Sequence, residues 1–139
     1  MKISAKTDYA CRAVLELAVH WPNSMPVQIG AIAQSRKIPV KFLTQILVDL
    51  KQSGVVESIR GQKGGYVLAR APKEITLRDV VSSFEKAVLP ARSKQGKMDV
   101  FVGIWNEMEE EAKKVLERTT FGDILKNEHN LNKVQMFEI

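Results

Sequence analysis

At residues 60–68 the chain reads Arg60-Gly61-Gln62-Lys63-Gly64-Gly65-Tyr66-Val67-Leu68. A run rich in β-branched residues at 55–59 leads into this stretch, and a second short apolar run begins at Tyr66. Two such runs around a glycine-containing turn predict a β-hairpin, here with the cations Arg60 and Lys63 at its tip. An amphipathic helix pattern at 40–53 comes directly before it. Helix, strand, basic turn and strand, in that order, form the ending of a winged helix-turn-helix.

Three helices precede the hairpin in this interpretation, at 5–20, 27–35 and 40–53. Apolar side chains recur at three- and four-residue steps in these segments, as helices with one buried face require. Pro39 suits the first turn of the third helix, and Gly54 suits its end. The inward stripe of the third helix consists of Leu43, Ile46, Leu47 and Leu50, with Phe42 contributing.

The second half of the chain predicts helices separated by a loop. A helix at 76–85 begins at the cap residue Thr76. A flexible loop spans 86–99, the longest helix pattern spans 100–119, and one short helical element follows at 120–125, before a tail without an assigned structure. The apolar stripe of the longest helix includes Phe101, Ile104, Trp105, Met108, Ala112 and Val115.

The expected architecture is mainly α-helical with one small hairpin. It divides into a winged helix-turn-helix DNA-binding domain (1–85), the flexible loop (86–99), and a dimerisation helix with its C-terminal tail (100–139). The stripe on the long helix is wide for a monomer of this size, and exposed apolar patches usually mark a partner. A homodimer interface explains the stripe. The alternative is that the stripe packs against the first helix of the same chain, and the stripe can serve both contacts.

Positive charge is concentrated in the half of the chain that carries the hairpin. Residues 1–70 hold ten basic and four acidic side chains, a net of +6, whereas the whole chain carries +5. Binding to DNA phosphates needs positive charge in this half, because the release of counterions supplies much of the affinity for DNA. A generic basic surface is the simpler alternative.

No apolar run approaches the ~20 residues of a membrane span. No signal peptide is visible, so a cytoplasmic protein is expected.

Five side chains are candidates for contacts with double-stranded DNA. On the exposed face of the third helix, Gln45 can pair with adenine, Thr44 can hydrogen bond or touch a thymine methyl, and Lys41 can reach guanine or phosphate. At the hairpin tip, Arg60 can enter a narrow minor groove, and Lys63 can contact phosphate. The competing interpretations are an ordinary solvated helix face and a hairpin whose glycines serve only the turn.

Other classes of function fit the residues less well. A nucleotide-binding loop would need Gly-Lys-Ser/Thr followed by a helix, and here a strand follows the glycines. No nucleophile, base and orienting residue form a recognisable set, so no enzymatic activity is expected. The alternative function is a winged-helix protein–protein adaptor that has lost DNA binding, which Asp49, an acid on the third helix, favours. A steep salt dependence of DNA binding separates the two.

Several ordered segments carry a family resemblance. They are residues 6–13, 32–33, 38–47, 50–56, 60–61, 64–68 and, more weakly, 119–124. These segments resemble the Rrf family of bacterial winged-helix transcription regulators, of the IscR, NsrR and CymR type. The resemblance implies a homodimer built through the long helix, with two heads reading a pseudo-palindromic operator as a repressor. The centres of the two half-sites of this operator would lie ~34 Å apart. An effector, a partner protein or oxidation would change the angle between the heads and release the DNA.

The resemblance also bears on cofactors. Cluster-binding members of this family carry three cysteines in the loop before the long helix, and the loop at 86–99 has none. Because thiolates hold such clusters, no iron–sulfur cluster and no other cofactor is expected. Asp8 matches a position that supplies a carboxylate ligand in some members, but alone it cannot hold a cluster. Thr44 stands where IscR-like members have an acid, so the operator preference should differ from theirs.

The chain has one cysteine, Cys11, which is expected to be a small buried side chain. A redox switch is the alternative, because the neighbouring Arg12 would favour the thiolate and a dimer brings a second Cys11. A single cysteine excludes an internal disulfide and any all-cysteine metal site within one chain.

Overall fold

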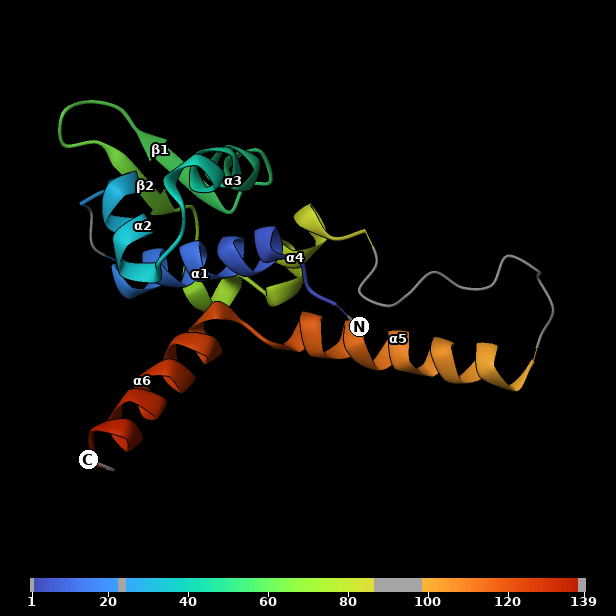
Figure 1. Cartoon of the computed structure of the whole chain (residues 1–139). Coiled ribbons are helices and arrows are strands. Elements are labelled where there is room, and N and C mark those ends of the chain that lie inside the picture. The colour runs from blue at the N-terminus through green and yellow to red at the C-terminus, as the bar shows by residue number, and fades with distance from the viewer. Residues whose placement is uncertain (1, 23–24, 87–98, 138–139) are drawn as a thin grey trace.

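The computed structural model describes residues 2–22, 25–86 and 99–137 (Figure 1). Residues 5–22 and 25–84, which we call the head, form a group of helices with a hairpin on one side. The side chain of Ser4 caps the first helix by accepting a hydrogen bond from the Thr7 backbone N–H at 3.2 Å. The helices of the head before the hairpin are α1 (Ala5–Val19), α2 (Ile29–Arg36) and α3 (Val40–Gln52).

The predicted hairpin is present, and it pairs with an additional segment. Strands β1 (Val56–Ile59) and β2 (Gly65–Leu68) are antiparallel. Val27 also pairs with Tyr66 of β2, since each backbone N–H donates to the other residue's carbonyl at 2.9 Å. The prediction that the second helix starts at residue 27 is therefore wrong. Val27 is extended because it is paired with the hairpin, and α2 starts at Ile29.

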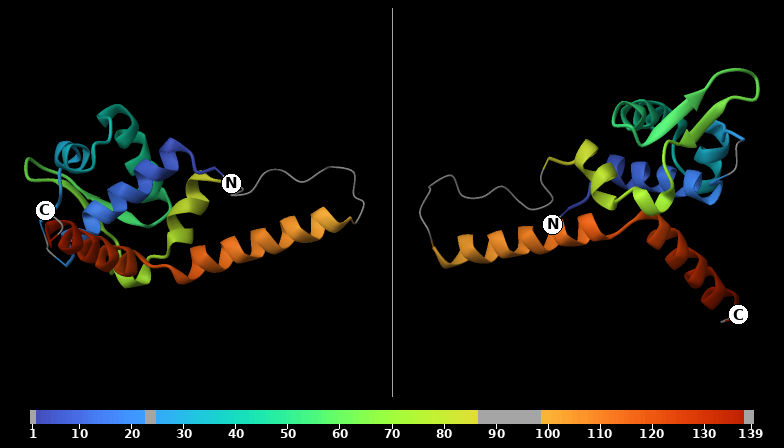
Figure 2. Two further views of the ribbon diagram at one scale, coloured as in Figure 1. Left: turned by 60° about the horizontal axis from the view of Figure 1, so that its bottom comes forward. Right: turned by 180° about the vertical axis from the view of Figure 1, so that it is seen from behind.

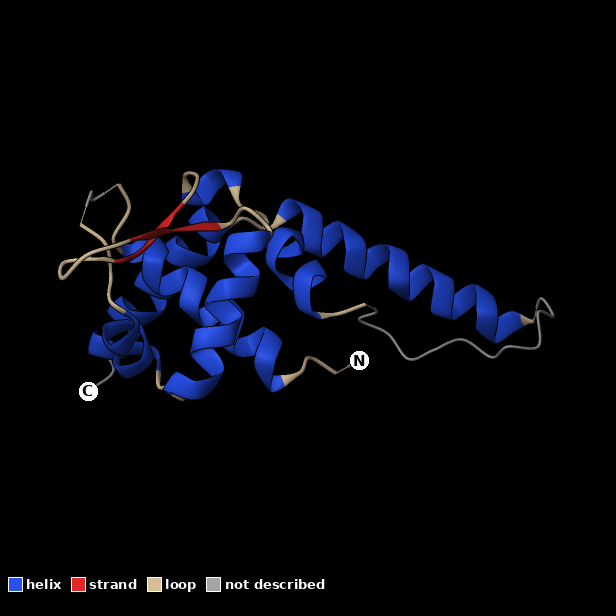
Figure 3. Ribbon diagram, turned by 90° about the horizontal axis from the view of Figure 1, so that it is seen from above, coloured by secondary structure: helices blue, strands red, loops and turns tan. Residues whose placement is uncertain are grey.

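Helices dominate the rest of the described chain (Figure 3). The expected cap is confirmed in the fourth helix, where Thr76 and Asp79 bond to each other's backbone N–H groups as a capping box. The prediction of a short element and an unassigned tail at the C-terminus is wrong. One helix of 17 residues is formed there. Residues 123–137 contain neither glycine nor proline, and the burial of Phe121 in the core anchors the start of the helix. These elements are η1 (Pro72–Glu74), α4 (Leu77–Phe84), α5 (Val100–Arg118) and α6 (Phe121–Phe137).

The start of α6 belongs to the core of the head. Phe121 is 0% exposed and packs among the buried apolar side chains of the head. Its backbone N–H donates to the Ile75 carbonyl at 2.9 Å, and the Thr119 carbonyl accepts from the Leu77 N–H at 2.8 Å. By contrast, α5 has no buried residue and projects away from the head (Figure 2). The four predicted inward residues of α3 are fully buried: Leu43, Ile46, Leu47 and Leu50.

The predicted fold class, mainly α-helical with a small hairpin, is confirmed. None of the helices in the described part of the chain combines the length and hydrophobicity that a bilayer crossing requires. The predicted loop at 86–99 falls almost wholly on residues 87–98, which lie outside the described residues.

The pairing of Val27 with the hairpin gives a test of the fold. A Cβ atom on Gly65 would lie 2.4 Å from the Val27 carbonyl oxygen, whereas one on Gly30 in α2 would meet nothing within 4 Å. Gly65→Ala should lower the free energy of unfolding by ~1–3 kcal/mol, because the backbone must move apart. Gly30→Ala should raise it by up to ~1 kcal/mol through helix propensity. Urea unfolding measures both, and equal stability of the two variants would contradict the pairing.

Candidate nucleic-acid interface

Helix α3 presents the predicted reading residues on one exposed face. Lys41, Thr44 and Gln45 are spaced three and four residues apart, so they lie together on the helix surface, and all three are exposed. The Thr44 hydroxyl donates to the Val40 carbonyl at 3.0 Å. Its proton is therefore used, and its oxygen remains available as a hydrogen-bond acceptor. The Gln45 amide donates to Asp49 Oδ1 at 3.0 Å.

The prediction that Phe42 contributes to the inward stripe of α3 is wrong. It is 48% exposed, and its ring stacks on Tyr9 of α1 with 6.2 Å between centroids. Lys41 Nζ lies 5.0 Å from the Phe42 centroid, within range of a cation–π contact. The physical reason is that α1 supplies a second aromatic ring at the edge of the core, so Phe42 can bury one face while staying at the surface. Phe42 thereby holds the Lys41 ammonium group beside the exposed face of α3.

The hairpin tip is built by glycines and exposes its two cations. Gly61 has a φ of +116°, which favours glycine, and a Cβ on Gly64 would lie 2.2 Å from the Ile59 carbonyl oxygen. Both glycines are thus needed for the turn itself, as the competing interpretation held. Arg60 and Lys63 are nevertheless exposed there.

Two contacts that the sequence pattern does not predict fix the hairpin relative to the helices. Gln28, the residue before α2, donates from its side chain to the Gln62 carbonyl at 3.2 Å. Lys51 at the end of α3 donates to the Ser58 hydroxyl of β1 at 2.8 Å. Figures 1 and 2 show α3 and the hairpin on the side of the head opposite α5 and α6. No periodic pattern in the sequence could have identified these bonds, because each joins polar residues from separate elements.

Ion pairs neutralise part of the positive charge that the sequence places in this half. Lys6 Nζ lies 3.4 Å from Asp49 Oδ2, so the acid on α3 is paired with a cation from α1. Arg12 Nε lies 2.8 Å from Asp8 Oδ2. Within the described residues, no ion pair involves the remaining predicted cations, and these are Lys41, Arg60 and Lys63. These three cations, on α3 and at the hairpin tip, are therefore not neutralised by the described residues.

The thiol of Cys11 is not activated by its neighbour. Burial, with a contribution from the Asp8 carboxylate, raises the pKa of Cys11 to about 12. The expectation that Arg12 favours the thiolate is wrong, because the Arg12 guanidinium is engaged by Asp8 on the same helix. At neutral pH the group is a thiol, which is the unreactive form.

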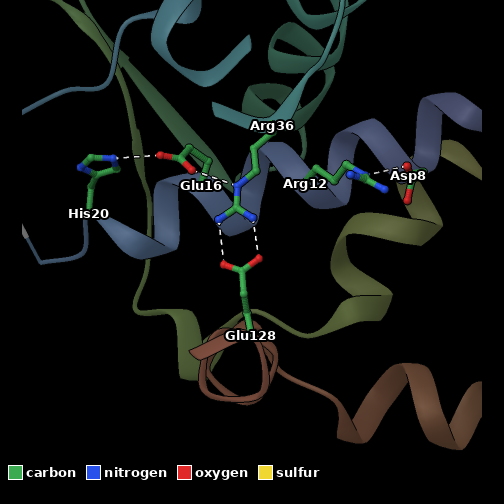
Figure 4. A network of polar contacts seen from close by, with 6 residues as sticks. All are labelled: Asp8, Arg12, Glu16, His20, Arg36 and Glu128. Atoms are coloured by element: carbon green, nitrogen blue, oxygen red, sulfur yellow. Dashed lines mark hydrogen bonds and ion pairs between the residues drawn. The ribbon is translucent and has the colours of Figure 1, made fainter. Parts of the chain in front are cut away.

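A network of polar groups joins the helix-turn-helix to the C-terminal helix (Figure 4). Arg36, the last residue of α2, makes two parallel bonds to Glu128 of α6 at 2.6 and 3.0 Å. Its Nε donates to Glu16 of α1 at 2.9 Å, and the other oxygen of Glu16 lies 3.1 Å from His20 Nε2. The bonds to Glu128 and Glu16 raise the pKa of Arg36, and the bond from Arg36 lowers the pKa of Glu128.

Comparison with known proteins decides the family. The Rrf2 family model, described as "Iron-dependent Transcriptional regulator", matches residues 3–127. The chain belongs to the Rrf2 family. The HTH-type transcriptional regulator CymR of Bacillus subtilis is 31% identical over 139 residues, which cover 100% of both chains. Members of this family are DNA-binding transcriptional regulators, and the chain is one of them.

Solved structures of Rrf2 relatives have the same fold. The structure of CymR, the global cysteine regulator of B. subtilis, matches with a TM-score of 0.84 and 31% identity, over 91% of this chain and 98% of that one. IscR of T. potens matches with a TM-score of 0.78 and 31% identity, over 91% of this chain and 88% of that one. The predicted resemblance and the winged-helix fold are thus confirmed.

The residues do not fit the iron dependence in the family's description. The whole chain has one cysteine, and burial keeps its thiol protonated. An iron–sulfur cluster needs several thiolates or imidazoles. Among the described residues, no group of three or more His, Cys, Asp or Glu is placed to hold a metal ion, and Asp8 is paired with Arg12. The described part of this Rrf2 protein therefore offers no set of side chains that could hold an iron–sulfur cluster.

The Arg36–Glu128 contact predicts a pH dependence of stability. The lowered pKa of Glu128 means that its stabilising contribution is complete above its ordinary value of 4.5. The contribution declines as the pH falls from there to the lowered pKa, and is lost below it. Glu128→Gln should cost ~1.5–3 kcal/mol above pH 5, and the difference from wild type should shrink in acid.

The matched control is Glu110→Gln, which removes an exposed carboxylate 3.6 Å from Lys113 on α5. Its effect should stay within ~0.5 kcal/mol, as for other exposed pairs. Urea unfolding at several pH values measures both variants. A cost of Glu128→Gln that is equal at every pH, or no larger than that of the control, would contradict the assigned role of Glu128.

Proposed function

We propose that the protein is a homodimeric repressor that reads a pseudo-palindromic operator with two α3 helices and two hairpin tips, without an iron–sulfur cluster. The observation that carries the proposal is the placement of α3 and the hairpin on one side of the head. Their cations form no ion pairs with the described residues. This arrangement suits a helix in the major groove and a hairpin at the flanking minor groove.

The polar atoms of α3 limit what it can read. Because the Thr44 proton is committed to Val40, the hydroxyl oxygen can accept from the amino group of adenine or cytosine, and the methyl group can touch thymine. Gln45 retains its carbonyl oxygen and one amide proton beside the bond to Asp49, enough for adenine. Lys41 supplies charge to guanine or phosphate. This combination supports recognition of bases as well as of the backbone.

The pairing of Asp49 weakens the case for an adaptor. An unpaired acid on α3 would repel phosphates, whereas the Lys6 ammonium group lies 3.4 Å from it and offsets its charge. Asp49 also accepts the bond from Gln45, so it orients a candidate reading residue. Both contacts suit a helix that faces DNA.

A dimer through α5 explains the exposed apolar side chains of that helix. The stripe predicted from sequence lies on a helix without a buried residue, and the rings of Phe101 and Trp105 stack with 6.1 Å between centroids. Burial of such aromatic side chains supplies most of the energy of many interfaces. The proposed interface residues on α5 are Phe101, Ile104, Trp105, Met108, Ala112 and Val115.

Arg60→Ala tests the hairpin tip. If Arg60 enters the minor groove or contacts a base, the variant should lose ~1–3 kcal/mol of operator affinity, or roughly 5- to 150-fold in Kd. A control is Lys126→Ala, which removes an exposed cation from α6 on the opposite side of the head. Fluorescence anisotropy with an operator selected from genomic fragments measures both. Equal effects of the two variants would remove Arg60 from the interface.

Trp105→Lys tests the dimer. Trp105 is 47% exposed in the single chain, and burying an unpaired charge at the centre of an interface should weaken the dimer by at least ~2 kcal/mol, about 30-fold in Kd. The control is Glu107→Lys, which introduces the same lysine side chain on the water-facing side of α5 and should leave the dimer intact. Sedimentation equilibrium distinguishes them. A monomeric wild type at all concentrations would contradict the proposed assembly.

A further inference from the structure

A cavity of about 270 Å³ lies between the end of α1, the residues that precede α2, and the two strands of the hairpin. We call it the hairpin pocket. Its volume is near the lower end of the ~300–1,000 Å³ typical of small-molecule sites, which suits a ligand of one or two rings. Its walls are largely aromatic and aliphatic, with one imidazole. The lining residues used below are His20, Trp21, Val27, Ile59, Tyr66 and Val67.

Apolar side chains at the pocket are left open to water. Trp21 is 40% exposed and Ile59 is 44% exposed. Covering such surface with an apolar ligand is favourable by roughly 25 cal/mol per Å². Planar rings fit best, because they can lie against Trp21 and Tyr66.

His20 determines the polar group that the ligand should carry. Its Nε2 lies 3.1 Å from a Glu16 oxygen, and the other Glu16 oxygen accepts from Arg36. The Glu16 carboxylate, which also accepts from the Arg36 guanidinium, accepts this bond, so the imidazole donates from Nε2. In the tautomer of the ring that carries its only proton on Nε2, Nδ1 is an acceptor that the bond to Glu16 does not use. A ligand with an N–H or O–H donor matches it.

The pocket shares its walls with the contacts that position the hairpin. Val27 and Tyr66, which pair through two backbone bonds of 2.9 Å, both line it. Ile59 also lines it and directly precedes Arg60. A ligand that moves these walls would move the hairpin tip relative to α3.

From this geometry we infer that the hairpin pocket binds a small, planar, largely apolar molecule with a hydrogen-bond donor, and that binding changes affinity for DNA by moving the hairpin. The effect on DNA rests on the proposed function; the binding of the ligand does not.

Two probes of matched shape test the binding. Indole has one N–H donor, and benzofuran has an oxygen in its place. Titration of the full-length ¹⁵N-labelled protein by NMR should shift the amide signals of Val27, Ile59 and Tyr66 with indole. Benzofuran should bind roughly fivefold more weakly, as the loss of one neutral hydrogen bond implies. Absence of shifts, shifts confined to α5, or equal affinity for both probes would overturn the assigned ligand chemistry.

Variants locate the site. Trp21→Ala removes a wall and should weaken indole binding about tenfold, the scale expected for an aromatic contact in a desolvated site. Ile59→Trp should block binding by filling the cavity from a partly exposed strand position. Phe42→Ala removes an exposed aromatic ring outside the pocket and should leave indole affinity unchanged. Unshifted amide signals from α4, which carries none of these substitutions, verify the fold of each variant. Wild-type indole binding by both pocket variants would overturn the site.

The effect on DNA is measured separately. Saturating indole should change the operator affinity of the wild type but not that of Ile59→Trp. Indole binding at the pocket without any change in operator affinity would overturn the regulatory half of the inference. A wild type that binds no DNA fragment would instead contradict the proposed function, while the NMR titration would still decide whether the pocket binds its ligand.

Discussion

The pairing of Val27 with Tyr66 is the constraint on which the geometry of this protein depends. A two-stranded hairpin alone is marginal in water, and here a third segment joins it through two bonds of 2.9 Å. Gly65 allows the close approach, since a side chain there would meet the Val27 carbonyl. Bonds from Gln28 and Lys51 complete the attachment. These bonds therefore set the position of the hairpin relative to α3, on which the proposed contact with two grooves of DNA depends.

Much of the fold could be predicted from the sequence, because local patterns encode it. The stripe of α3, the cap at Thr76 and the glycine-containing turn each depend on neighbours a few residues away. The errors share another cause. Val27 is extended through a partner 39 positions along the chain, and α6 is stabilised through the burial of Phe121 in a distant core. Non-local contacts of this kind override local propensity, and one sequence does not reveal them.

The same distinction applies to the candidate interface. Exposure of Lys41, Thr44, Gln45, Arg60 and Lys63 follows from periodicity and turn chemistry, and the structure places all five at the surface. Their roles in DNA binding stay predictions. The ion pair that offsets the charge of Asp49 joins α1 to α3, so counting charges along the chain could not find it. Similarly, only the folded chain brings Arg36 to Glu128 and connects the helix-turn-helix to α6.

Hydroxyl-radical footprinting of the protein on a selected operator tests the central claim most directly. Two twofold-related heads, each with a helix in the major groove and a hairpin at the adjacent minor groove, predict two protected half-sites about 34 Å apart. Each half-site should be flanked by a protected stretch of minor groove. A single continuous footprint without twofold symmetry, or half-sites without flanking minor-groove protection, would contradict the account.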